Sequence, residues 1–163
     1  MARKVFYSFH YVPDNWRAAQ IRQAGVLEGN QPISDNDWEE VTDGGDAAIQ
    51  KWIDNQFFGK SCAVVLIGAK TAGRKWINYE IRKAWEDRKG LVGVHIHNLL
   101  DRNSHQSYKG HNPFDDFNVD GVKLSSIVKA YDPPFTTSTY VYGHITSNIA
   151  AWVEEAIAIR ARY

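Results

Sequence analysis

Hydrophobic residues occur along the chain in short runs that predict strands. On an extended chain the odd-numbered residues from 5 to 11 share one side, and Phe6, Ser8 and His10 share the other. Apolar groups on both sides predict a strand that is covered on both faces. Residues 62–68 are apolar throughout and predict a central strand. Three further strands are predicted at residues 91–97, 26–27 and 140–142.

Helical spacing of apolar residues predicts the intervening elements. A first helix is expected after Pro13, with Asp14 as its N-cap and Trp16 among its inward residues, and it ends near Gly25. Further segments with apolar residues at helical spacing are 46–58, 78–88 and 149–157. Ser147 is expected to cap the last of these helices.

Two polar regions interrupt this alternation. Residues 30–45 are rich in turn-forming residues and predict a long loop, which in a compact domain is often functional. Residues 101–143 predict a long irregular insertion before the C-terminal helix, with a short helix near 124–130. No repeat or linker divides the chain, so residues 1–163 are interpreted as a single domain.

Strands that alternate with helices predict an α/β fold with right-handed crossovers. We expect a flavodoxin-like, three-layer domain around a central, mainly parallel five-stranded sheet. In such sheets ligands bind at the carboxyl ends of strands where the winding direction reverses. In chain order the first predicted strand is at residues 5–11 and the third is at 62–68, and the reversal lies between these two strands. This would bring Ser8, Phe9 and His10 close to residues 68–78.

Composition and charge narrow the classes of function. The 163 residues include 19 basic and 19 acidic side chains, so there is no electrostatic case for nucleic acid or an anionic membrane as a partner. No apolar run is long enough to span a membrane, and no signal-peptide core follows the first residues. We therefore expect a cytoplasmic protein. Cys62 is the only cysteine, which excludes an internal disulfide and favours a buried, inert thiol.

Two phosphate-handling sites are weighed and disfavoured. Residues 68–75 nearly match a P-loop, but Arg74 replaces the phosphate-binding lysine and Lys75 replaces the hydroxyl that binds magnesium. A phosphoryl-accepting receiver needs an aspartate at the end of the third strand, where this chain has Gly68. A glycine-containing loop with a basic rim is the better interpretation.

Two metal sites are weighed in the same way. His95 and His97 face one side of a strand and could bind zinc together with Asp101 or His111. Structural histidines are the preferred interpretation. The acidic run at 35–43 could suggest calcium, but it lacks the glycine that an EF-hand needs at its sixth position. No metal is expected.

Trp76 and Glu80 lie four residues apart at the start of a helix, and so on one face of it. A glutamate near a helix N-terminus has a structural explanation, because it complements the helix dipole. Trp76 could equally belong to the core. The pair alone therefore leaves a catalytic role open.

The sequence resembles the Toll/interleukin-1 receptor (TIR) domain family. Lys4–Phe9 resembles its opening strand, Ser61–Gly68 its central strand, and Lys75–Ile81 its Trp-x-x-x-Glu helix motif. The loop Ser34–Gly45 stands where the family has its mobile BB loop. The chain is most similar to the bacterial TIR-like group that includes the signal-producing subunit of Thoeris antiphage systems. The likeness covers residues 3–98 and the final helix, and segment 101–143 departs from the receptor-type pattern.

This resemblance implies an enzyme that cleaves the nicotinamide–ribose bond of NAD+, which it uses as a substrate and not as a cofactor. Glu80 would be the catalytic carboxylate that stabilises an oxocarbenium-like state. The Rossmann fingerprint Gly-x-Gly-x-x-Gly is absent, which agrees with NAD+ being consumed. The substrate-binding residues that the resemblance implies are Ser8, Phe9, His10, Asp37, Trp76 and Asn78.

Two functions therefore stay open. The first is an enzyme that makes a nucleotide second messenger in antiphage defence, as a glycohydrolase, cyclase or ADP-ribosyl transferase. It implies self-assembly through TIR contacts, a phage-derived trigger, and a downstream effector that reads the small-molecule signal. The second is a non-catalytic TIR adaptor module, since a fold does not decide a function. An adaptor needs no acid at position 80, so Glu80 favours the enzyme.

Overall fold

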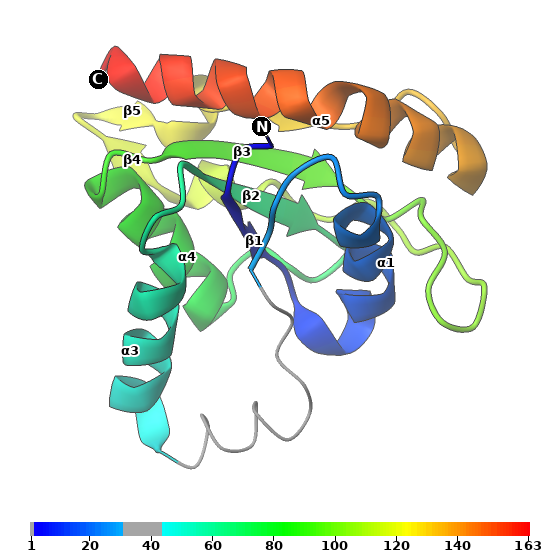
Figure 1. Cartoon of the computed structure of the whole chain (residues 1–163), viewed down its shortest axis with the longest axis horizontal. Coiled ribbons are helices and arrows are strands. Elements are labelled where there is room, and N and C mark those ends of the chain that lie inside the picture. The colour runs from blue at the N-terminus through cyan, green and yellow to red at the C-terminus, as the bar shows by residue number, and fades with distance from the viewer. Residues whose placement is uncertain (1, 31–43) are drawn as a thin grey trace.

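A parallel sheet forms the centre of the structure, a computed structural model that describes residues 2–30 and 44–163. Its four strands lie in the order β1-β2-β3-β6, and every neighbouring pair is parallel (Figure 1). The strands are β1 (Val5–Ser8), β2 (Cys62–Ile67), β3 (Gly90–His95) and β6 (Ala130–Tyr131). The predicted α/β class and mainly parallel sheet are confirmed.

The predicted count of five strands is wrong by one among the described residues. Near the predicted strand 26–27, a single parallel bridge joins Glu28 to Lys4, and no strand is formed there. The Val5 N–H donates to the Glu28 carbonyl at 2.8 Å, so this segment still lies at the outer edge of β1. The chain therefore moves outward after β1 and returns to its other side as β2. The reversal of winding lies between these two strands, where it was predicted.

Helices cover both faces of the sheet, as the three-layer prediction required (Figure 1). Helices α1 (Tyr11–Gln23) and α5 (Ser138–Ala161) pack on one face. Helices α3 (Gly45–Phe57) and α4 (Lys75–Glu86) pack on the other. The four helices predicted around these positions are confirmed, although α4 begins three residues before its predicted start at residue 78 and α5 begins earlier still.

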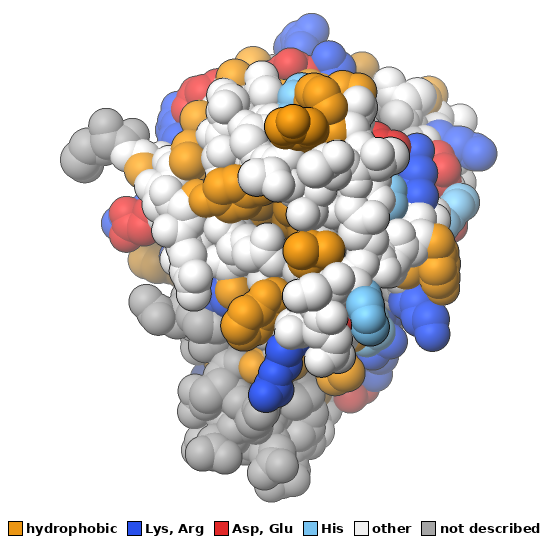
Figure 2. Space-filling view, turned by 90° about the vertical axis from the view of Figure 1, so that its right-hand side faces the viewer, with side chains coloured by type: hydrophobic (Ala, Val, Ile, Leu, Met, Phe, Trp, Pro, Cys, Tyr) orange, Lys and Arg blue, Asp and Glu red, His pale blue; other side chains and the backbone are white. Residues whose placement is uncertain are grey.

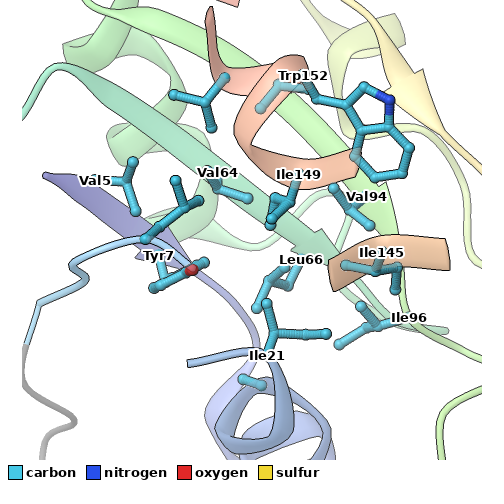
Figure 3. Close-up of a cluster of buried hydrophobic side chains, with 14 of the residues drawn as sticks. Val5, Tyr7, Ile21, Val64, Leu66, Val94, Ile96, Ile145, Ile149 and Trp152 are labelled. Atoms are coloured by element: carbon cyan, nitrogen blue, oxygen red, sulfur yellow. The ribbon is translucent and has the colours of Figure 1, made fainter. Parts of the chain in front are cut away.

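The core on the α1/α5 face is built from alternate residues of the strands (Figure 3). Val5 and Tyr7 of β1 lie beside Val64 and Leu66 of β2, facing Ile21 of α1. All five side chains are at most 3% exposed. Full burial of large apolar side chains stabilises a fold by about 1.5–3 kcal/mol each.

The opposite face of β1 has a polar end. Phe6 is 1% exposed and stacks on Phe57 of α3 with ring centroids 4.3 Å apart. Ser8 is two residues further on and so projects from the same face, which is the face covered by α4. The strand register thereby aims a buried hydroxyl at α4. This position connects the fold to the candidate site.

Helix α1 begins at Tyr11, so the prediction that Asp14 is its N-cap is wrong. Pro13 lies in the first turn, where a missing N–H costs no intrahelical hydrogen bond. Asp14 is therefore inside the helix, 1% exposed, and pairs with Arg17 at 2.9 Å. The prediction that Trp16 faces inward is also wrong, since it is 52% exposed.

Helix α5 begins at Ser138, so the strand predicted at residues 140–142 and the cap predicted at Ser147 are wrong. Tyr140 and Tyr142 flank Val141 and imitate the alternation of a strand. The packing instead follows a spacing of four: Val141, Ile145 and Ile149 are each at most 1% exposed against the sheet. The helical stripe therefore starts earlier than the sequence pattern indicated.

The segment predicted as an irregular insertion contains short elements. They are η1 (Pro113–Asp116), β4 (Asn118–Val119), β5 (Val122–Lys123), η2 (Leu124–Ser126), β6 and the start of α5. Strands β4 and β5 form a separate antiparallel pair. The helix predicted near 124–130 is a single 3-10 turn, because the chain then joins the sheet as β6. Within the described part of the chain, no helix is long and apolar enough to cross a membrane.

Candidate active site

A cleft of about 370 Å³ opens at the carboxyl end of β1, at the predicted reversal of winding. Four segments surround it: the end of β1 with the start of α1, Asn30 in the chain after α1, the start of α4, and one residue of α3. Its lining residues are Phe6, Tyr7, Phe9, His10, Tyr11, Val12, Asn30, Trp52, Arg74, Lys75, Trp76, Ile77 and Glu80. Of the sequence-predicted site residues, the lining thus includes Phe9, His10, Trp76 and Glu80.

Glu80 occupies the inner wall of this cleft. Ile77, Ile81 and Ala84 hold the inner face of α4 against the sheet, each at most 3% exposed. Glu80 lies next to this apolar stripe and is 9% exposed. The Ser8 hydroxyl donates a hydrogen bond to Glu80 Oε2. Strand β1 and helix α4 thus bring together two predicted site residues that are 72 positions apart.

Burial dominates the acid–base behaviour of Glu80. It raises the pKa of this carboxyl from 4.5 to about 8, because the charged form loses its hydration. The hydrogen bond from Ser8 opposes this shift but is weaker. In the free protein Glu80 is therefore mostly protonated at neutral pH. A carboxyl with such a displaced pKa in a cleft is typical of functional sites.

Aromatic rings form the walls of the cleft. Phe9 stacks with Tyr11 at 6.3 Å between centroids, and Trp76 meets Tyr79 edge to face at 5.7 Å. Tyr11 and Trp52 also line the cleft, although the sequence placed Tyr11 in a strand and Trp52 among the apolar residues of the predicted helix 46–58. An aromatic wall is suited to a flat ligand ring. The sequence did place Trp52 on a helix, now α3, but it could not show that this helix directs the side chain toward a cleft.

Positive charge lies at the mouth of the cleft. Arg74 and Lys75 are exposed, and both line it. Lys75 forms an ion pair with Asp46 of α3 and lies over the Trp76 ring, 4.9 Å from its centroid. His10 lies nearby, and burial, followed by the charges of Arg74 and Lys70, lowers its pKa below 6.5. His10 is therefore mostly neutral at pH 7, and its Nδ1 is buried without a hydrogen-bond partner.

Three predicted site residues are absent from the described cleft lining. Ser8 is connected to the cleft only by its hydrogen bond to Glu80. Asn78 is on α4 but is not among the lining residues. It follows Trp76 by two positions, which is about 200° around a helix, so the two side chains occupy opposite flanks. Asp37 lies outside the described residues, as do most of the predicted loop 30–45 and the acidic run 35–43. Asn30 is a lining residue that the sequence analysis did not predict. Its Oδ1 accepts a hydrogen bond from the Tyr7 N–H at 2.8 Å.

The histidine pair weighed for zinc lies outside the cleft lining. His95 and His97 do face one side, with ring centroids 5.9 Å apart, and they are 4% and 8% exposed. Burial lowers the pKa of His95 to about 4 and also lowers that of His97. Within residues 2–30 and 44–163 no three potential ligands lie close enough together to hold a metal ion. His111 is turned toward Asp115 and Asp116 instead.

The glycine-containing loop after β2 is closed by its own side chains. The Gly68 N–H donates to Thr71 Oγ at 2.8 Å, and Thr71 is fully buried. A Cβ added to Gly68 would lie 2.0 Å from Asp14 Oδ2. The space next to Gly68 is thus occupied by a buried carboxylate, which repels phosphate. This packing disfavours a P-loop, as the sequence did.

Comparison with known proteins identifies the family. Residues 6–101 match the family model described as "Thoeris protein ThsB, TIR-like domain". A Bacillus cereus (strain MSX-D12) protein named "Putative cyclic ADP-D-ribose synthase ThsB1" is 33% identical over 133 residues, which is 76% of this chain and 69% of that protein. The matched residues include Phe6 to Ser8 of β1 and the α4 segment with Trp76 and Glu80. The chain therefore belongs to the family of ThsB TIR-like domains.

Proposed function

We propose that this protein cleaves NAD+ at the nicotinamide–ribose bond and that Glu80 is its catalytic group. One observation carries the proposal: a buried carboxyl, hydrogen-bonded by Ser8, lies in an aromatic-walled cleft at the reversal of winding. The name of the relative, a cyclic ADP-D-ribose synthase, supports the same substrate. Phe9, His10 and Trp76 line that cleft and would contact the nicotinamide and ribose.

The proposed step is heterolysis of one carbon–nitrogen bond. The electron pair of that bond goes to the pyridinium nitrogen, so nicotinamide leaves neutral and needs no proton. The ribose C1′ becomes an oxocarbenium-like cation, and an ionised Glu80 would stabilise its charge. Water then attacks C1′ in a hydrolase, and a nucleophile within the same molecule attacks in a cyclase. One carboxylate is enough because the leaving group is already activated.

The raised pKa of Glu80 is compatible with this role. In the free protein the carboxyl is mostly protonated at neutral pH, since its pKa is about 8. The nicotinamide ring of NAD+ carries a positive charge, and an opposite charge within a few ångströms favours the ionised form of a carboxyl. Substrate binding would therefore lower the pKa and generate the carboxylate. The buried carboxylate and the cationic ring would stabilise each other away from water.

We further propose that the reaction produces a nucleotide second messenger in antiphage defence. The family and the synthase name of the relative support this role. A phage-derived trigger and an effector that binds the product would complete the pathway. Val12 and Trp16, 85% and 52% exposed and one turn apart on α1, would be available for self-assembly. Figure 2 shows the side of the molecule on which α1 lies, where hydrophobic side chains form separate patches.

The experiment is to incubate the purified protein with NAD+, with and without lysate from phage-infected cells. Nicotinamide release is followed by chromatography, and the nucleotide product is identified by mass spectrometry. We expect nicotinamide together with a cyclic ADP-ribose isomer, which differs from linear ADP-ribose by the mass of one water. If NAD+ stays intact under both conditions, the enzyme proposal is wrong and the adaptor alternative is favoured.

A further inference from the structure

The cations at the mouth of the cleft are not used by the cleavage chemistry. Arg74 and Lys75 line the cleft, and Glu80 is the one acidic side chain among its described lining residues. Since Glu80 is buried and hydrogen-bonded at the inner end, the outer end is positive. The chain has no net charge, so this concentration of charge is local. A cleft with one positive end attracts an anionic group to that end.

The backbone adds to this attraction. Arg74 is the N-cap residue of α4, and its side chain makes no capping hydrogen bond. The first N–H groups of an α-helix have no intrahelical acceptor, and the helix dipole favours negative charge at this end. No acidic residue occupies the first turn of α4.

Lys75 can exchange its present partner at little cost. Its ion pair with Asp46 has both side chains 63% exposed, and exposed pairs contribute about 0–1 kcal/mol. Its ammonium already lies 4.9 Å from the Trp76 ring centroid, on the cleft side of α4. A phosphate oxygen could therefore replace the Asp46 carboxylate. Asp46 would then act as a competitor for the same cation.

The spacing along α4 indicates which part of a ligand would lie there. Lys75 and Glu80 are five residues apart, which is about 7.5 Å along a helix axis. This distance is comparable with the length of one ribose unit. A ribose held at Glu80 would thus present its 5′-phosphate to the start of α4.

We propose that Arg74, Lys75 and the amino end of α4 form the subsite for the diphosphate of a dinucleotide. This inference rests on the proposed function, since it takes Glu80 to hold the adjoining ribose. It fixes the direction of the substrate in the cleft: nicotinamide riboside inward and diphosphate outward. The subsite binds dinucleotides more tightly than nucleosides, which have no phosphate.

The test is calorimetric titration of the wild-type protein and its variants with inorganic pyrophosphate and with ADP-ribose. Arg74→Gln and Lys75→Gln each weaken binding of both probes by about tenfold, and the double variant by about 100-fold, as expected for hydrogen bonds to a charged group. Both residues are exposed, so these variants fold. Two matched controls are available. Asp46→Asn removes the same ion pair but leaves the cation, and it maintains or tightens binding; Arg82→Gln removes an exposed cation elsewhere on α4 and has no effect.

The outcomes separate this inference from the proposed function. The inference is overturned if wild-type protein binds neither probe, or if the double variant binds both as tightly as wild type. Either result overturns it whether or not NAD+ is cleaved. If the probes bind as expected while NAD+ stays intact under every condition, the diphosphate subsite stands and the proposed cleavage is wrong.

Discussion

Two carboxyl groups are buried at the same edge of the sheet, Asp14 on α1 and Glu80 on α4. They are 1% and 9% exposed, and burial is the largest cause of the raised pKa of each. Their partners differ. Asp14 faces the guanidinium of Arg17 at 2.9 Å, whereas Glu80 accepts a hydrogen bond from the neutral hydroxyl of Ser8.

The surroundings of the two groups differ as well. Arg17 also donates to the carbonyls of Leu99 and His105, at 2.8 and 2.9 Å, and so fastens α1 to the loop after β3. Asp14 is absent from the cleft lining, and Glu80 is part of it. Burial alone therefore does not identify a catalytic carboxyl. What distinguishes Glu80 is a neutral partner and access to a ligand-sized space.

The largest expected effect is on the pH dependence of the unfolding free energy, because Glu80 is buried beside a neutral partner and not beside a cation. Its folded pKa of about 8 exceeds the ordinary 4.5, so the folded state holds its proton where the unfolded state has released it. Stability is therefore lost as pH rises from 4.5 toward 8, by about 4–5 kcal/mol at most. Glu80→Gln removes this loss, so its stability relative to wild type increases with pH. Urea unfolding at pH 5 and pH 8 measures the difference.

Glu86→Gln is the matched control, because Glu86 is on the same helix and exposed. It leaves the pH dependence of the unfolding free energy as in wild type. A Glu80→Gln variant whose stability falls with pH as steeply as that of wild type would contradict the buried, protonated carboxyl.

A smaller effect on the free energy of unfolding is expected from breaking the ion pair between Asp14 and Arg17. Arg17→Met leaves the Asp14 charge buried and unpaired, which costs about 3–5 kcal/mol of unfolding free energy. The loss shrinks at low pH, where Asp14 is protonated. The double variant Arg17→Met/Asp14→Leu recovers much of the stability, because no buried charge is then left. If Arg17→Met unfolds at the wild-type urea concentration at pH 8, the pair has no structural role.

The smallest effect concerns the Ser8 hydroxyl. Its hydrogen bond lowers the pKa of Glu80, so Ser8→Ala shifts the acid limb of the kcat/KM profile for NAD+ cleavage to higher pH. Loss of a single hydrogen bond lowers the rate on that limb by about two- to tenfold. Ser8→Thr retains the hydroxyl and the wild-type position of the limb. A limb that does not move in Ser8→Ala would show that Ser8 does not set the ionisation of Glu80.

The sequence could predict what depends on local patterns. The uniformly apolar residues 62–68 indicated β2. The alternation of residues 5–8 placed Tyr7 on one face of β1 and Ser8 on the other. From these elements followed the reversal of winding and the closeness of Ser8 to the segment after β2; the hydrogen bond from Ser8 to Glu80 was seen only in the structure. The strand count and the start of α5 were missed. Residues 140–142 alternate like a strand, and only packing against the sheet reveals the helical stripe that starts at Val141.

The side-chain partners of the site depend on contacts that no local pattern encodes. Asn78 belongs to the correct helix but projects from its other flank. Asp14 resembled a helix cap because it follows Pro13 at an expected helix start, and its real partner, Arg17, is held by carbonyls more than 80 residues away. Trp52 matched a core position, yet α3 turns it toward the cleft. Each of these outcomes depends on how segments that are distant in the sequence pack around the cleft and the sheet.

The catalytic role of Glu80 is tested most directly by the rate of NAD+ cleavage in matched variants. Wild type, Glu80→Gln and Glu86→Gln are compared at pH 8, after unfolding curves confirm that all three are folded. We expect Glu80→Gln to lower kcat/KM by at least about 100-fold, and Glu86→Gln to leave it unchanged. A folded Glu80→Gln protein that cleaves NAD+ at the wild-type rate would contradict this role.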